Sequence, residues 1–155
     1  MKKFFVLALT ALTFTSAYAA TTGTLLLKGT VPRLLDITVT PTSIASTLPL
    51  NTSQTNTVVA SVNEKSNSVS GYKVSISSAN AGKLVHQSVT SSSINYSLRY
   101  NSAAINLATG QTVTYSSSTP ANANRSVDIS YTGVAHDLLI EGDYSDTVTF
   151  TIAAN

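Results

Sequence analysis

Hydrophobic and polar residues alternate along much of this chain with the period of two that is typical of β-strands. The clearest alternations are Tyr72/Val74/Ile76, Ile94/Tyr96/Leu98/Tyr100, Val127/Ile129/Tyr131 and Val148/Phe150/Ile152. Alternating or apolar runs predict strands at 24–31, 34–39, 57–62, 71–77, 83–87, 94–100, 112–116, 126–131 and 144–153, and residues 137–140 suit a helical turn. Short strands separated by turn-forming residues, without a helical period, predict an antiparallel β-sandwich or barrel.

The segment 21–31 alternates over an unusually long stretch and is followed by a turn signal, Pro32. Its alternate positions are Gly23, Leu25, Leu27, Gly29 and Val31. A strand with one apolar face at the free end of a domain either joins the sheet of its own domain or completes the sheet of another molecule. The alternation alone leaves both possibilities open.

Residues 1–19 have the three parts of a secretory signal peptide. Lys2 and Lys3 form the charged start, residues 4–14 form the apolar run, and Ala17-Tyr18-Ala19 has the small-x-small pattern of a cleavage site. We therefore expect cleavage after residue 19 or 20. The apolar run of this segment is shorter than the roughly 20 residues needed to span a bilayer. No later apolar run approaches that length, so we expect no membrane insertion by the mature chain.

Composition narrows the class of protein further. About 136 of the 155 residues follow the predicted signal peptide, a usual size for one domain. Lys2 and Lys3 are two of nine basic residues, so the mature chain has as many basic as acidic residues and lacks the basic surface expected of a nucleic-acid-binding protein. It contains no cysteine, and an exported domain without disulfides suits a bacterial envelope or surface.

The two ends of the chain resemble the subunits of chaperone–usher pili and the related spore-coat-protein-U-like secreted domains. Residues 25–31 are similar to the pilin donor strand, with alternating apolar residues, a glycine and one further apolar residue. Residues 142–152 look like the terminal strand of the family, and Gly142 is the fourteenth residue from the end, where pilins characteristically carry a glycine. The chain departs from the family at Ala154, where an aromatic residue is frequent, and near Asp36, where many pilins have the first cysteine of a disulfide.

This resemblance implies an all-β fold: an incomplete immunoglobulin-like antiparallel β-sandwich over residues 32–155, completed by donor-strand exchange with the extension 20–31 of a neighbour. The implied function is that of a structural subunit of a bacterial surface fibre, a fimbria or pilus, that polymerises head-to-tail. The donor residues would be Leu25, Leu27, Gly29 and Val31. The acceptor groove, or the edge that the chaperone binds, would comprise Gly142, Tyr144, Val148, Phe150 and Ile152.

The implied partners are like subunits, a periplasmic chaperone and an outer-membrane usher, on a route through the periplasm to the surface of a Gram-negative-type bacterium. The main alternative is a self-contained secreted β-sandwich that binds a ligand, as an adhesin or lectin does, with residues 21–31 completing its own fold. A sugar-stacking platform could be formed by Tyr72, Tyr96, Tyr100, Tyr115 and Tyr131, but most of them alternate with core aliphatics, and we expect them to be packed.

Catalysis and cofactors are not expected. His86 and His136 are the only histidines, neither has the spacing of a metal ligand, and no nucleophile-elbow pattern accompanies His136-Asp137. The carboxylates Glu141, Asp143 and Asp146 cluster near a turn but lack the regular spacing of a calcium loop. We predict a non-enzymatic protein without a metal or cofactor.

Overall fold

The structure of the protein is a computed structural model that describes residues 20–155. The predicted signal peptide, residues 1–19, lies outside the described residues. The chain divides between Val31 and Pro32 into two units, which are considered separately below. No helix in the described part of the chain has the length and apolar character needed to cross a membrane.

Residues 20–31 form neither helix nor strand. The side chains of Leu25, Leu26, Leu27 and Val31 are between 82% and 86% exposed. The strand predicted at 24–31 is therefore wrong for the single chain, because an extended segment becomes a strand only when a neighbour accepts its backbone hydrogen bonds.

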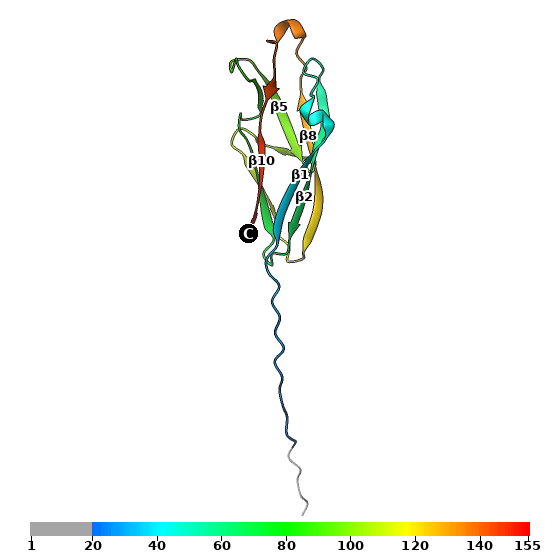
Figure 1. Cartoon of the computed structure of the whole chain (residues 1–155), viewed down its shortest axis with the longest axis vertical. Coiled ribbons are helices and arrows are strands. Elements are labelled where there is room, and N and C mark those ends of the chain that lie inside the picture. The colour runs from blue at the N-terminus through cyan, green and yellow to red at the C-terminus, as the bar shows by residue number, and fades with distance from the viewer. Residues whose placement is uncertain (1–19) are drawn as a thin grey trace, which may run out of the picture. The chain divides into compact units, whose positions relative to one another are not determined.

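The unit Pro32–Asn155, called the body here, consists of two antiparallel β-sheets, so the all-β prediction is confirmed (Figure 1). The larger sheet has the order β1 (Leu35–Pro41), β2 (Gln54–Ser66), β8 (Ala121–Tyr131), β5 (Ser93–Tyr100), β4 (Lys83–His86) and β9 (Tyr144–Ser145), with β6 (Ala103–Ile105) also paired to β5. The smaller sheet has the order β10 (Val148–Ala154), β3 (Tyr72–Ser78) and β7 (Gln111–Tyr115). Two short 3-10 turns, η1 (Ser43–Ser46) and η2 (His136–Leu138), complete the body, and η2 overlaps the helical turn suggested at 137–140.

Apolar side chains that alternate along the strands form a core shared by the two sheets. Val74 and Ile76 of β3 are buried against Val62 and Val127 of the larger sheet. The alternations recognised in the sequence at 72–76 and 127–131 therefore mark buried faces, as predicted.

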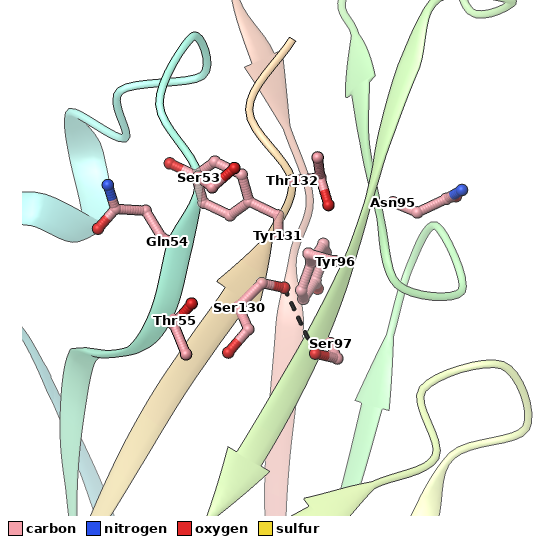
Figure 2. Close-up of a pocket in the computed structure, with 9 residues that line it drawn as sticks. All are labelled: Ser53, Gln54, Thr55, Asn95, Tyr96, Ser97, Ser130, Tyr131 and Thr132. Atoms are coloured by element: carbon pink, nitrogen blue, oxygen red, sulfur yellow. Dashed lines mark hydrogen bonds between the residues drawn. The ribbon is translucent and has the colours of Figure 1, made fainter.

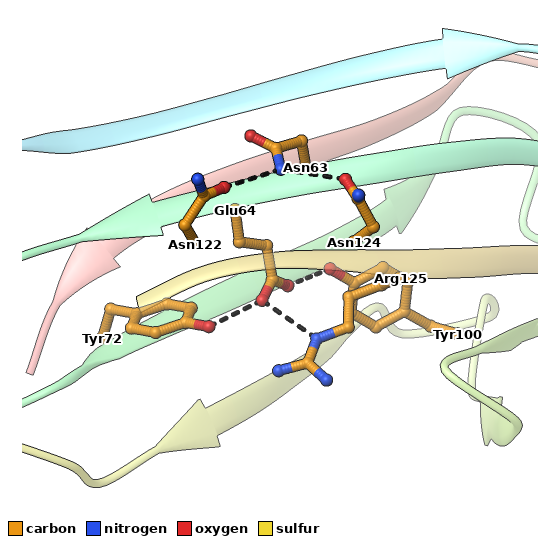
Figure 3. Close-up of polar contacts among 7 residues, drawn as sticks. All are labelled: Asn63, Glu64, Tyr72, Tyr100, Asn122, Asn124 and Arg125. Carbon is orange, nitrogen blue, oxygen red and sulfur yellow. Dashed lines mark hydrogen bonds and ion pairs between the residues drawn. The ribbon is translucent and has the colours of Figure 1, made fainter. Parts of the chain in front are cut away.

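The strands β2 and β8 extend well beyond their predicted limits, into sequence rich in Asn and Ser. Their outward faces carry Asn63, Asn122 and Asn124, and the side-chain amide of Asn63 donates hydrogen bonds to Asn122 at 3.0 Å and to Asn124 at 2.9 Å (Figure 3). These cross-strand contacts satisfy polar groups on the exposed face, so residue types with low β-propensity are tolerated in the strands.

The single strand predicted at 144–153 is wrong, because the chain leaves one sheet and enters the other within it. β9 pairs with β4 of the larger sheet, whereas β10 pairs with β3 of the smaller sheet. Asp146 fixes this change of direction, since its Oδ1 accepts hydrogen bonds from the backbone N–H groups of Asn80 at 2.9 Å and Thr147 at 2.7 Å.

One fully buried carboxylate connects the two sheets from within the core. Glu64 of β2 accepts hydrogen bonds from the hydroxyl of Tyr72 at 2.7 Å, from the hydroxyl of Tyr100, and from Arg125 Nε at 3.3 Å (Figure 3). The Arg125 guanidinium also lies over the ring of Tyr115, 4.8 Å from its centroid. These contacts compensate for the desolvation of the charge, and we refer to the five residues as the polar core cluster.

The polar core cluster predicts a large difference between two adjacent residues. Glu64→Ala should lower the free energy of unfolding by roughly 2–4 kcal/mol, because Arg125 and two tyrosine hydroxyls lose a buried partner. Lys65→Ala is the matched control, since Lys65 forms only a surface pair with Asp36, with side chains 41% and 44% exposed, and should cost less than about 1 kcal/mol. Urea denaturation of both variants tests this, and similar losses for the two would contradict it.

The same cluster predicts how stability depends on alkaline pH. Burial, followed by the hydrogen bond to Glu64, raises the pKa of Tyr72 to about 12, and the same causes raise the pKa of Tyr100. Because both values lie above the ordinary tyrosine pKa of about 10, the stability that these groups contribute is complete below pH 10 and is lost as the pH rises toward 12. Tyrosinate absorbance should show late ionisation that coincides with unfolding; ionisation of every tyrosine near pH 10 in a folded protein would contradict this.

Candidate interaction site: the seam between β1 and β10

The strands β1 and β10 are edges of different sheets that lie close to each other without pairing (Figure 1). β1 pairs only with β2, and β10 pairs only with β3. Each strand therefore presents unpaired backbone N–H and C=O groups along one side, which is the usual template for adding a further strand.

Apolar side chains follow this boundary and are only half-buried. They pack against the core from β1 and β10 but are not covered on their outer side. We define them together as the seam: Leu35, Ile37, Val148, Phe150 and Ile152. Half-buried large aliphatic and aromatic side chains in a row can bury further area when another apolar strand covers them.

The seam contains three of the residues singled out in the sequence, Val148, Phe150 and Ile152. Sequence reasoning missed Leu35 and Ile37, although their alternation within the predicted strand 34–39 was the available signal. The ring of Phe150 lies 5.7 Å from that of Tyr100, centroid to centroid. Phe150, in the middle of the seam, therefore packs on a residue of the polar core cluster.

An apolar cavity of about 120 Å³ lies where β10 begins. It is lined by Ala45, Leu48, Val59, Leu84, Tyr96, Leu98, Ile129, Asp146 and Val148. The polar atoms at its margin are already bonded, since Asp146 Oδ2 accepts the Tyr96 hydroxyl at 2.6 Å and the Ser78 hydroxyl. A cavity of this composition favours an apolar side chain over water.

Gly142 and Tyr144, the other two predicted acceptor residues, do not belong to this edge. Tyr144 lies on β9 in the larger sheet, and its hydroxyl contacts Ser92 at 2.7 Å and the Ile140 carbonyl at 3.0 Å. The prediction that Tyr144 shares one strand with Val148 was wrong, because the chain changes sheets at Asp146 before β10 begins, and Tyr144 lies on the outer strand of the other sheet.

Gly142 instead packs against the buried imidazole of His86. His86 Nδ1 accepts hydrogen bonds from the backbone N–H groups of Ser88 at 3.1 Å and Val89 at 2.9 Å. The proton must therefore be on Nε2, which donates to the Glu141 carbonyl at 2.9 Å. This bond brings the turn so close to the ring that only a residue without a side chain fits at Gly142.

Gly142→Ala should therefore destabilise the body. The φ angle at Gly142 is +138°, and a Cβ atom there would lie 2.3 Å from His86 Nε2, so either the turn or the ring must move. Gly23→Ala is the control, because a Cβ at Gly23 meets nothing within 4 Å. Thermal unfolding should show a Tm drop of several degrees for the first variant only; an unchanged Tm for Gly142→Ala would contradict the packing described.

The residues considered for metal binding are not brought together. His136 lies exposed on η2, Glu141 and Asp143 are exposed, and Asp146 is engaged by the hydrogen bonds described above. Within residues 20–155, no group of three His, Asp or Glu side chains is placed to hold a metal ion.

A shallow polar depression of about 510 Å³ lies across β2, β8 and β5 (Figure 2). It is lined by Ser53, Gln54, Thr55, Asn95, Tyr96, Ser97, Ser130, Tyr131 and Thr132. Its Tyr131 ring is buried and the hydroxyl of Tyr96 is bonded to Asp146, while Tyr72 and Tyr100 are buried in the core. Tyr72, Tyr100 and Tyr131 therefore pack inside the body, as their alternation with core aliphatics predicted.

Comparisons with known proteins give no assignment. No protein-family model matches the chain, and no curated protein is significantly similar to it. The resemblance to chaperone–usher pilins therefore stays a prediction that depends on the residues themselves.

Proposed function

We propose that the protein is a structural subunit of a bacterial surface fibre and that it polymerises head-to-tail by donor-strand exchange. One observation carries the proposal: the same chain has an uncovered seam between two unpaired edges and an extension with exposed, alternating apolar residues. In this interpretation the body is an immunoglobulin-like sandwich that lacks one strand, and residues 20–31 of the next subunit supply it.

The extension has the side chains that such a strand needs. Leu25, Leu27 and Val31 point to one side of an extended chain, and each would contribute roughly 1.5–3 kcal/mol when buried in the seam. Gly29 would allow the two backbones to approach closely, and each new main-chain hydrogen bond would add about 1 kcal/mol. Donor and acceptor are different surfaces of one subunit, so the contact repeats into a filament.

The direction of the donor strand follows from the sheet that it extends. The smaller sheet is antiparallel throughout, so we infer that the donor runs antiparallel to β10. The end of the donor at Val31 would then lie beside Val148, at the apolar cavity of about 120 Å³, and Val31 would fill that cavity. The body of the donating subunit would begin beyond this end, so successive bodies would be arranged one after another along the fibre.

The uncovered seam also accounts for the other proposed partners. An exposed apolar edge aggregates unless it is covered, and a periplasmic chaperone would cover it by β-strand addition before polymerisation. Transfer from the chaperone to the neighbouring subunit would take place at an outer-membrane usher, after export to the periplasm. No step of this proposal involves covalent chemistry.

Moving the donor strand to the other end of the chain tests the proposal. The wild-type mature chain, expressed without a chaperone, should give a ladder of multimers on an unheated denaturing gel that collapses on boiling. When residues 21–31 are fused after Asn155 through a short flexible linker, the ladder should disappear, and the Tm should rise by at least about 10 °C because the seam is covered intramolecularly.

The matched control is the same fusion with Leu27→Asp in the added strand, which places a charge against the seam and should abolish most of the Tm gain. A stable wild-type monomer whose Tm does not respond to the fusion would contradict the proposal and support the self-contained binding module instead.

A further inference from the structure

The two ends of the body carry different surfaces. Residues 135–143 form one end, where η2 lies, and Asp137, Glu141 and Asp143 are all exposed there (Figure 1). This segment contains no Lys or Arg. It also exposes Leu138, whose side chain is 75% accessible, so the end is both acidic and apolar.

A cleft of about 440 Å³ opens at this same end. Its walls are mainly apolar and come from the segments before β2 and before β9: Leu48, Pro49, Leu50, Leu139 and Ile140, with Asn51, His136, Glu141, Gly142 and Tyr144 completing the lining. An apolar cleft bordered by acidic side chains is suited to a partner surface that is apolar and basic.

The opposite end of the body has that character. Residues 32–34 and the loop between β2 and β3 meet there, because Asn67 accepts a hydrogen bond from the backbone N–H of Leu34 at 2.6 Å and donates one to the Pro32 carbonyl at 2.8 Å. Arg33 is exposed between these two anchored residues, and Val69 of the same loop is 82% exposed. The neighbouring acid, Asp36, is already paired with Lys65 at 3.5 Å.

We propose that the acidic, apolar end of one body docks the Arg33 end of a second copy of this chain, as a contact additional to the donor strand. This inference rests on the proposed function, because the donor direction places Pro32 of the next copy where β10 begins, and β10 follows the acidic segment closely in the chain. Arg33 would then emerge beside Glu141 and Asp143, and the exposed side chain of Val69 would face the cleft.

Such a contact would set the angle between successive bodies. The donor strand joins two subunits through residues 20–31, and without a second contact each body could swing about the junction at Pro32. Complementary charge around an apolar contact favours one orientation. The docked ends would therefore make the fibre stiff, whereas the donor strand makes it continuous.

Charge reversal separates these two roles. In Glu141→Lys/Asp143→Lys the backbone bonds of the turn are kept, because His86 and the Gln87 N–H bond only to the carbonyl oxygens of residues 141 and 143. The unheated gel ladder should persist, while the persistence length of fibres in electron micrographs should fall by about two-fold or more. Arg33→Glu should give the same result, and combining it with the double reversal should restore stiffness.

Two controls complete the experiment. Lys83→Glu, an exposed charge change at the start of β4 and outside both docking segments, should leave stiffness unchanged, and high salt should soften wild-type fibres by screening the contact. Circular dichroism identifies any variant that fails to fold, in which case Arg33→Glu alone decides.

An intact ladder with unaltered stiffness, or a combined variant that is not restored, would overturn the docking inference but not the fibre function. Absence of the ladder in wild type would overturn the fibre function and this inference with it.

Discussion

The unpaired edges of β1 and β10 are the constraint on which the rest of the structure depends. Within each sheet, neighbouring strands supply each other's hydrogen bonds, but at this boundary an edge of one sheet lies beside an edge of the other without a ladder. The large apolar side chains beside it, including Phe150, consequently pack on the core and stay half-buried. A strand from outside the body is the simplest way to satisfy both the backbone groups and the side chains, which is why the proposed function begins here.

A body with an open boundary needs other means to hold its sheets together, and the polar core cluster provides one. Glu64 and Arg125 come from the larger sheet, Tyr72 and Tyr115 come from the smaller one, and their contacts cross the core. Hydrogen bonds to a buried charge are stronger than neutral ones and depend on geometry, so they fix how the sheets face each other. The chain has no cysteine that could do this covalently.

Periodicity identified most of the fold because burial on one face of a strand leaves a direct trace in the sequence, as at Val74 and Ile76. It could not identify Glu64, since a charged residue in an alternating run has the pattern of a surface position and its partners are distant in sequence. The change of sheet at Asp146 was equally hidden, because the carboxylate acts on Asn80. In the candidate site, the sequence pattern identified the apolar residues of β10. It placed Tyr144 on the same strand, because the change of sheet at Asp146 could not be recognised.

The extension exposes its apolar side chains to water, and its backbone is not paired in a sheet. This has an energetic consequence for the proposed assembly. Every subunit of the proposed fibre would carry both a donor segment and an acceptor seam, and pairing of the two between subunits would be favourable. Elongation would then proceed without nucleotide hydrolysis, and a growing fibre would be polar, with an empty seam at one tip and a free extension at the other.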